Sequence, residues 1–293
     1  GQTKNWADAN GYTLGNPESY EDWSGCRDLD HSSSNVQTIV NAYLKYLLND
    51  LGYKGFRYDM VKGYAPQYTG IYNTASGTEF SVGEYWDGNP SVVENWINGT
   101  KTDNTIQSGA FDFAFRYTVR DAINDNDWRK LDNATITSNA TYRRYAITFV
   151  ENHDTEYRSF SAQQDPIRRD TLAANAFLIA MPGTPCVFLK HWQAYKQEIK
   201  SMIEARKLAG ITNTSSFINF RSAAGYNSKR VTGTNGELLV YVGNTVAFTP
   251  SPSAYTQILS GYHYKYFLAN TMETTWADMA SGEYESAFNV KLT

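Results

Sequence analysis

Two short segments of the chain place a carboxylate beside groups that tune its acidity. Residues 55–59 read Gly-Phe-Arg-Tyr-Asp, and residues 80–87 read Phe-Ser-Val-Gly-Glu-Tyr-Trp-Asp. On an extended strand Arg57 and Asp59 point to the same side, where a guanidinium keeps a carboxyl ionised, as a nucleophile requires. Apolar and aromatic residues around Glu84 would raise its pKa, which suits a general acid. The two segments therefore offer a nucleophile and a proton donor.

A third segment, residues 149–154, reads Phe-Val-Glu-Asn-His-Asp. The adjacent His153 and Asp154 could hydrogen-bond sugar hydroxyls, and such bonds strengthen as a sugar ring flattens toward an oxocarbenium ion. Each of the three segments also has a structural explanation: an Arg–Asp pair at a strand end, a solvated Glu, or the cap of a turn. Three acidic strand ends in one parallel sheet favour the chemical explanation.

The elements that would carry these residues alternate between strand and helix. Apolar residues recur at spacings of three and four over residues 36–48, which predicts a helix. Further helices are expected at 91–98, 116–124 and 168–180, and strands at 55–59, 79–84, 110–115, 146–152 and 184–189. This alternation predicts parallel βα units, and a (β/α)8 barrel carries its catalytic groups at the carboxyl ends of its strands. Because a closed barrel has eight strands, either three units lie upstream of Gly1 or the fold is a smaller open sheet.

The three acidic segments, in this order, resemble signature segments of the α-amylase family, glycoside hydrolase family 13. The resemblance implies that Asp59 is the nucleophile, Glu84 the general acid/base and Asp154 the stabiliser of the transition state. Arg57 and His153 would support them and contact the substrate. It also implies retaining, endo-acting hydrolysis of α-1,4-glucosidic bonds in starch or glycogen, with the two working carboxyls roughly 5–5.5 Å apart. The similarity reaches plant-type and related bacterial α-amylases and covers nearly the whole chain.

An acidic stretch at residues 16–31 resembles the end of domain B in those enzymes, where a structural calcium ion is held. By position, the resemblance implies that the calcium ligands are Glu18, Asp28 and the carbonyls of Glu21 and Gly63. Calcium takes six to eight oxygens, so these four require others beside them. The family has Asp rather than Glu at the first of these positions, and a solvated acidic loop is the alternative interpretation.

Three more residues are implied in substrate binding. Lys62 and Tyr64 match a Lys-Gly-Tyr segment that touches glucose units on the leaving-group side, although a helix start would also explain them. Trp86 lies two residues after Glu84. Residues 188–192, Phe-Leu-Lys-His-Trp, depart from the family, which has Tyr soon after the Phe, so a sugar contact there has no support.

The predicted fold class is α/β: strands four to eight of a (β/α)8 TIM barrel, with the end of domain B before them and an antiparallel β domain after them. We expect domain B to end within residues 1–33, as a long irregular loop, and the barrel to cover residues 34–208. Residues 209–293 would form a small antiparallel sandwich, because they contain short alternating runs such as that at 237–242. The family's first signature segment, which ends in Asn-His, is absent from the sequence. We therefore expect an N-terminally truncated fragment of the enzyme.

Composition excludes several other classes of protein. The net charge is −4, without the basic cluster that a nucleic-acid partner requires. No apolar run is long enough for a transmembrane segment. Cys26 and Cys186 give neither a disulfide framework nor zinc spacing, and both are expected to be buried. We expect a monomer that is secreted, periplasmic or bound to the cell surface, because starch polymers do not cross membranes.

Three functions stay open alongside the endo-acting α-amylase. The same three carboxylates serve transglycosylases and oligosaccharide-acting α-glucosidases of the family, and product analysis on starch separates these. A glucan-binding protein that has lost catalysis would bind starch without releasing reducing ends. A flavodoxin-like protein is excluded because no Gly-rich phosphate loop follows any predicted strand.

Overall fold

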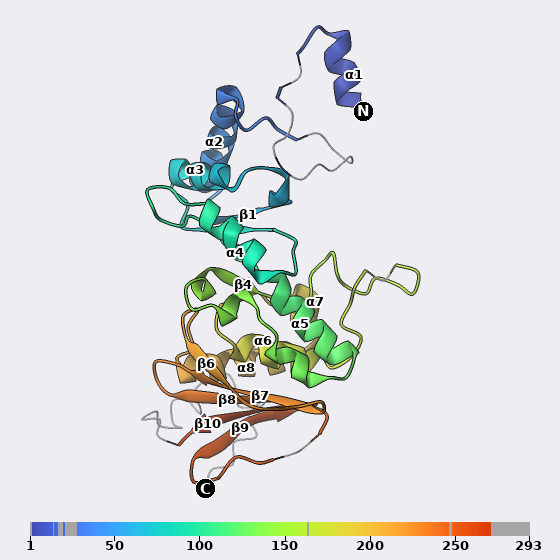
Figure 1. Cartoon of the computed structure of the whole chain (residues 1–293), viewed down its shortest axis with the longest axis vertical. Helices are drawn as coiled ribbons and strands as arrows, with labels where there is room; N and C mark the ends of the chain where they lie inside the picture. Colours follow the sequence, from blue (N-terminus) through green and yellow to red (C-terminus); the bar gives the residue numbers. More distant parts are fainter. Residues whose placement is uncertain are drawn as a thin grey trace. The chain divides into compact units, whose positions relative to one another are not determined.

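The computed structural model describes residues 2–13, 15–16, 20, 28–162, 164–245 and 248–270 (Figure 1). The chain divides into two compact units. The first unit comprises Gly1–Trp86 and Val92–Ala110, and the second comprises Asp87–Ser91 and Phe111–Thr293. None of the helices in the described part of the chain is long and apolar enough to cross a membrane.

The first unit carries parallel strands alternating with helices. Its elements, in chain order, are α1 (Gln2–Ala9), α2 (Ser34–Asn49), β1 (Gly55–Tyr58), the 3-10 turn η1 (Val61–Gly63), α3 (Pro66–Ser76), β2 (Phe80–Gly83), α4 (Pro90–Gly99) and the start of β3 (Gly109–Phe111). Strand β2 pairs in parallel with β1 and with β3. Leu44 of α2, Phe56 of β1 and Tyr72 of α3 form one buried cluster, which holds the two helices against β1.

Close packing fixes the end of β2. Trp96 of α4 is 3 % exposed and lies directly over Gly83. A Cβ at Gly83 would come within 2.2 Å of the indole Cη2, so only glycine fits beneath this ring. Because Gly83 directly precedes Glu84, this contact sets where that carboxyl leaves the strand.

The second unit continues the alternation and adds an antiparallel sheet. Its helical and parallel elements are α5 (Phe113–Asn124), η2 (Trp128–Asp132), η3 (Ile136–Ser138), η4 (Arg143–Tyr145), β4 (Ala146–Thr148), α6 (Thr171–Ala180), β5 (Thr184–Pro185), α7 (Leu189–Ala194) and α8 (Lys196–Ala209). Strands β4 and β5 pair in parallel.

The antiparallel sheet follows α8 in the chain. It consists of β6 (Ser216–Ala223), β7 (Tyr226–Thr232), β8 (Glu237–Gly243), β9 (Tyr255–Gly261) and β10 (Tyr264–Ala269), in the order β6-β7-β8-β10-β9. Its inner face shares one hydrophobic core with α5, α6 and α8 (Figure 1). The Tyr266 hydroxyl of β10 donates to the Ala176 carbonyl of α6 at 2.5 Å, which ties the sheet to that helix.

The predicted fold class is confirmed. Parallel strands β1 to β5 alternate with helices, and an antiparallel sheet follows them. The domain limits at residues 33, 34, 208 and 209 stay a prediction.

Several local predictions differ from the structure. A strand was expected over 110–115, but β3 ends at Phe111 because the Asp112 side chain accepts the backbone N–H of Phe115 and begins α5. The irregular loop expected at the N-terminus contains α1, in which Lys4 pairs with Asp8 one turn later. Cys186, expected to be buried, is exposed because it follows the short edge strand β5. Cys26 lies outside the described residues.

Candidate active site

The candidate site of the first unit lies at the carboxyl ends of β1 and β2. The parallel register pairs Arg57 with Val82 and Tyr58 with Gly83, so the residues that follow each strand come together. Asp59 follows β1, Glu84 follows β2, and the Glu84 N–H donates to the Tyr58 carbonyl at 2.9 Å.

Arg57 joins the two carboxylates. Its Nη1 pairs with Asp59, and its Nη2 lies 2.7 Å from Glu84 Oε1. Glu84 Oε2 accepts the Met60 N–H at 3.2 Å. The structure thus brings together three residues that the sequence singled out.

The two carboxyls have different surroundings. The Glu84 side chain is 5 % exposed, whereas that of Asp59 is 66 % exposed. Burial and the hydrogen bond with Asp59 raise the pKa of Glu84, and the Met60 N–H and the Arg57 charge oppose this rise. The direction is the one expected from sequence, and it leaves one buried, weakly acidic carboxyl beside an exposed one.

Two of the other predicted substrate-binding residues, Lys62 and Tyr64, contact neighbouring rings. Lys62 lies with its Nζ 5.2 Å from the ring centre of Tyr85. The Tyr64 ring packs against His31 at 4.4 Å between ring centres, and burial raises the pKa of the Tyr64 hydroxyl to about 12. Trp86 is 38 % exposed, so its indole is accessible.

His31 is a site residue that sequence reasoning did not select. Its Nδ1 lies 2.7 Å from the Tyr72 hydroxyl, and its ring contacts Tyr64. A cavity of about 590 Å³ is lined by His31, Tyr64, Arg57 and Asp59, among others. The only signal in the sequence was the position of His31 at the end of the acidic stretch.

The second unit carries the other predicted pair on a tight turn after β4. His153 Nε2 lies 3.0 Å from Asp154 Oδ2, with 64 % and 38 % of these side chains exposed. The Asp154 N–H donates to Asn152 Oδ1 at 3.1 Å, and the Thr155 hydroxyl donates to the same oxygen at 2.9 Å. The turn therefore presents two adjacent polar side chains to solvent.

The predicted calcium ligands are covered only in part. Glu18 and Glu21 lie outside the described residues. Asp28 and Gly63 lie close together, because a Cβ built on Gly63 would be 3.7 Å from Asp28 Oδ1. Among the residues that the structure describes, no group of three or more His, Cys, Asp or Glu side chains could hold a metal ion.

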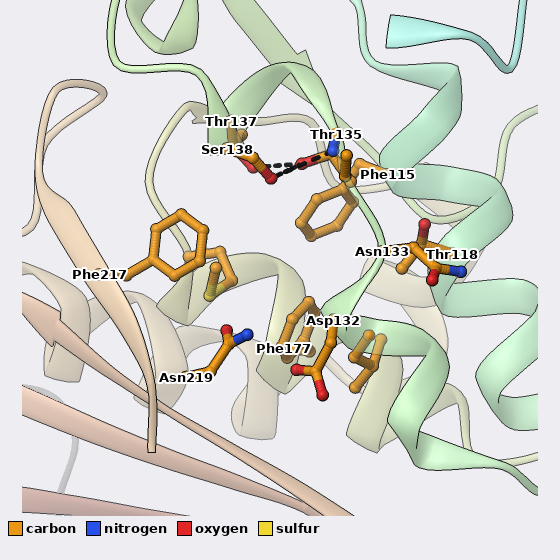
Figure 2. A pocket seen from close by; sticks show the side chains of 13 residues that line it. Phe115, Thr118, Asp132, Asn133, Thr135, Thr137, Ser138, Phe177, Phe217 and Asn219 are labelled. Atoms are coloured by element: carbon orange, nitrogen blue, oxygen red, sulfur yellow. Dashed lines mark hydrogen bonds between the residues drawn. The ribbon is translucent and has the colours of Figure 1, made fainter. Parts of the chain in front are cut away.

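A second cavity, of about 250 Å³, lies in the second unit (Figure 2). Phe115, Phe177 and Phe217 give it an apolar lining, and the Asp132 carboxylate at its edge is occupied by hydrogen bonds from Lys229 and Asn227. None of the predicted site residues that the structure describes lines it. The polar side chains that lie close together are instead those of Arg57, Asp59 and Glu84, at the carboxyl ends of β1 and β2.

Known proteins with similar sequences are amylases. An Arabidopsis thaliana protein named "Probable alpha-amylase 2" is 26 % identical over 271 residues, which cover 86 % of this chain and 63 % of that protein. A glucan 1,4-alpha-maltotetraohydrolase of Stutzerimonas stutzeri is 31 % identical over 236 residues, covering 74 % of this chain and 41 % of that enzyme. The chain resembles α-amylases. It spans less than two thirds of the length of these relatives, and no model of a known protein family matches it.

Solved α-amylases share the fold. An Anoxybacillus α-amylase superposes with a TM-score of 0.64 at 17 % identity, over 85 % of this chain and 66 % of that one. The α-amylase of Geobacillus thermoleovorans, solved with acarbose, gives a TM-score of 0.66 at 14 % identity, over 87 % and 72 %. At these identities the likeness concerns the fold, a barrel-type parallel sheet followed by an antiparallel sheet.

Proposed function

We propose that this protein is a retaining, endo-acting glycoside hydrolase that cleaves α-1,4-glucosidic bonds in starch-like glucans. The observation that carries the proposal is the pair formed by Asp59 and Glu84, joined by Arg57 at the ends of two parallel strands. Glycosidases use two carboxyl groups of which one is kept protonated by its surroundings. Burial raises the pKa of Glu84, which is the direction that a general acid requires.

In the proposed mechanism Glu84 donates its proton to the glycosidic oxygen as the bond to the anomeric carbon breaks. Asp59 attacks that carbon and forms a glycosyl ester. Glu84, now ionised, then takes a proton from water, and the water oxygen displaces Asp59 with return of the original configuration. Substrate entry would place the glycosidic oxygen beside Glu84, and Arg57 would stay paired with Asp59.

We assign supporting roles to the remaining residues. Asp154 and His153 would hydrogen-bond sugar hydroxyls and stabilise the flattened ring of the transition state. Lys62, Tyr64 and Trp86 would contact neighbouring glucose units, since aromatic faces and long polar side chains suit sugar rings. The names of the relatives, and the acarbose held by the similar Geobacillus thermoleovorans enzyme, support an α-glucan as the substrate.

We also propose a structural calcium ion near η1. The closeness of Asp28 Oδ1 to Gly63 fits two of the four ligands implied by the resemblance, the others being Glu18 and the carbonyl of Glu21. Bound to these hard oxygens, calcium would tie Asp28 to η1. Chelation with EDTA should lower the melting temperature of the wild type, and Asp28→Asn should remove most of that difference. An unchanged melting temperature with EDTA would contradict the site.

The location follows from the proposed substrate. Because polymeric glucans do not cross membranes, we infer that the protein acts outside the cytoplasm, and we infer a monomer.

The test is the release of reducing ends from soluble starch with calcium present. Asp59→Asn and Glu84→Gln should each lose at least about 10³-fold in kcat, the scale expected when a nucleophile or general acid is removed. Glu79→Gln is the matched control, because Glu79 is an exposed carboxylate at the opposite end of β2. Starch binding without hydrolysis would support a silent binding protein, and mainly transferred products would support a transglycosylase.

A further inference from the structure

A buried hydrogen-bonded cluster lies at the start of α7, in a segment for which the sequence predicted no function. His191 Nε2 lies 3.0 Å from Glu151 Oε2, and His191 Nδ1 lies 3.2 Å from Asn175 Nδ2. The three residues are 6 %, 8 % and 0 % exposed. They come from α7, from the segment after β4 and from α6, so the cluster joins three elements of the second unit.

The hydrogen bonds of this cluster fix the proton on His191. Asn175 Nδ2 also donates to the Thr171 carbonyl at 2.8 Å, which keeps the amide nitrogen turned toward His191. His191 Nδ1 must then accept, and Nε2 carries the proton that is donated to Glu151. The second oxygen of Glu151 accepts the Ile167 N–H at 2.8 Å. Both oxygens of this buried carboxylate are thereby engaged.

The neighbouring residue on α7 makes a second contact with the same stretch of chain. Lys190 pairs with Glu156, whose Oε1 also lies 3.6 Å from the Arg158 guanidinium. The hydrogen bond from Lys190 holds the pKa of Glu156 below its usual range. Glu151 and Glu156 thus lie on either side of the turn that bears Asp154, and α7 holds both.

These two glutamates are among the contacts that hold the turn. Its internal bonds include the Asp154 N–H to Asn152 Oδ1 at 3.1 Å, the Thr155 N–H to the Asn152 carbonyl at 3.2 Å and the Thr155 hydroxyl to Asn152 Oδ1 at 2.9 Å. Such bonds fix the shape of the turn but not its orientation on the unit. The orientation depends on Glu151 and Glu156, where the chain enters and leaves the turn. The Asp165 N–H, which donates to the Thr155 carbonyl at 3.2 Å, and the Arg158 guanidinium, which donates to the His153 carbonyl at 2.5 Å, also contribute.

We propose that α7 positions Asp154 for catalysis, with His191 and Lys190 as positioning residues that act through Glu151 and Glu156. The inference rests on the proposed role of Asp154 as a transition-state stabiliser. A displacement of roughly 1 Å at a catalytic group can cost about 10²-fold in rate. Removing the contact from His191 or from Lys190 should therefore lower kcat more than it changes KM, since Asp154 would act in the transition state rather than in binding.

The experiment compares His191→Leu, His191→Gln and Lys190→Met in the full chain, with Gln193→Met as a control on the exposed part of α7. Glutamine keeps an N–H for Glu151 and an acceptor for Asn175, whereas leucine has neither. Amide hydrogen exchange at Asp154 and Thr155 reports the turn without requiring activity. Kinetics on soluble starch report catalysis, and circular dichroism confirms folding.

We expect His191→Leu and Lys190→Met to speed amide exchange in the turn at least about tenfold and to lower kcat by about 10- to 100-fold, with KM changed less than threefold. His191→Gln and Gln193→Met should stay within about threefold of the wild type in both. Unchanged amide exchange in both His191→Leu and Lys190→Met would overturn the proposal. Faster amide exchange with unchanged kcat would also overturn the proposal, because His191 and Lys190 would then have only a structural role. A wild type without hydrolytic activity would refute the proposed function itself. The amide-exchange data would then test only whether His191 and Lys190 hold the turn. If the leucine variant fails to fold, Lys190→Met carries the test.

Discussion

Arg206 on α8 holds the segment that leads from α6 to β5, and its replacement by Met should destabilise the second unit. Its guanidinium donates to the carbonyls of Ile179, Met181 and Gly183 at 2.7, 2.5 and 2.9 Å. These are carbonyls at and just beyond the end of α6, which lack partners within the helix. Arg206 is 9 % exposed, so water does not readily replace it.

The expected loss is the difference between two opposing terms. Each carbonyl left unpaired costs about 1–3 kcal/mol, or roughly 6 kcal/mol for three. Against this, burial lowers the pKa of Arg206 to about 10, which corresponds to a desolvation cost of roughly 3 kcal/mol that the methionine variant no longer bears. The net loss is therefore about 3 kcal/mol, or about 6–12 °C in melting temperature.

Urea and thermal unfolding followed by circular dichroism measure this loss. Lys207→Met is the matched control, because the Lys207 side chain is 66 % exposed and its pair with Glu204 should be worth less than about 1 kcal/mol. If Arg206→Met costs no more than Lys207→Met, the three carbonyls find other partners and the reasoning is wrong.

Two further predictions concern the site. Gly83→Ala should lower the free energy of unfolding by about 1–3 kcal/mol, because it pushes a Cβ into Trp96. It should also lower kcat, because Glu84 follows directly. An unchanged free energy of unfolding would mean that the Trp96 ring moves aside freely. The alkaline limb of the pH profile of kcat/KM should follow Glu84, since activity falls as pH rises through the pKa of a general acid. Arg57 lowers that pKa, so Arg57→Leu should move the limb to higher pH, whereas the exposed Arg129→Leu should not; a limb that stays or moves down would contradict the assignment.

The parts of the site that the sequence predicted are those encoded locally. A short apolar run followed by a carboxylate predicts a strand and places the carboxylate at its carboxyl end. Asp59 and Glu84 could therefore be assigned to the ends of neighbouring strands. Arg57 and Asp59, two residues apart on an extended chain, could be paired for the same reason. The fold class followed from the same alternation of strands and helices.

The parts that were missed depend on pairs far apart in the chain. Glu151 and His191 are 40 residues apart, and His31 and Tyr72 are 41 apart, so no local pattern reveals either contact. The start of α5 was misplaced because the apolar run 113–115 fits a strand as well as a helix. The Asp112 cap decides between them.

The most direct test of the central claim is the anomeric configuration of the first products released from starch, followed by proton NMR before mutarotation. Retention by way of Asp59 and Glu84 predicts that new reducing ends appear as the α-anomer, and that Asp59→Asn releases almost none. Initial formation of the β-anomer, or full activity in Asp59→Asn, would contradict the assignment of these two residues.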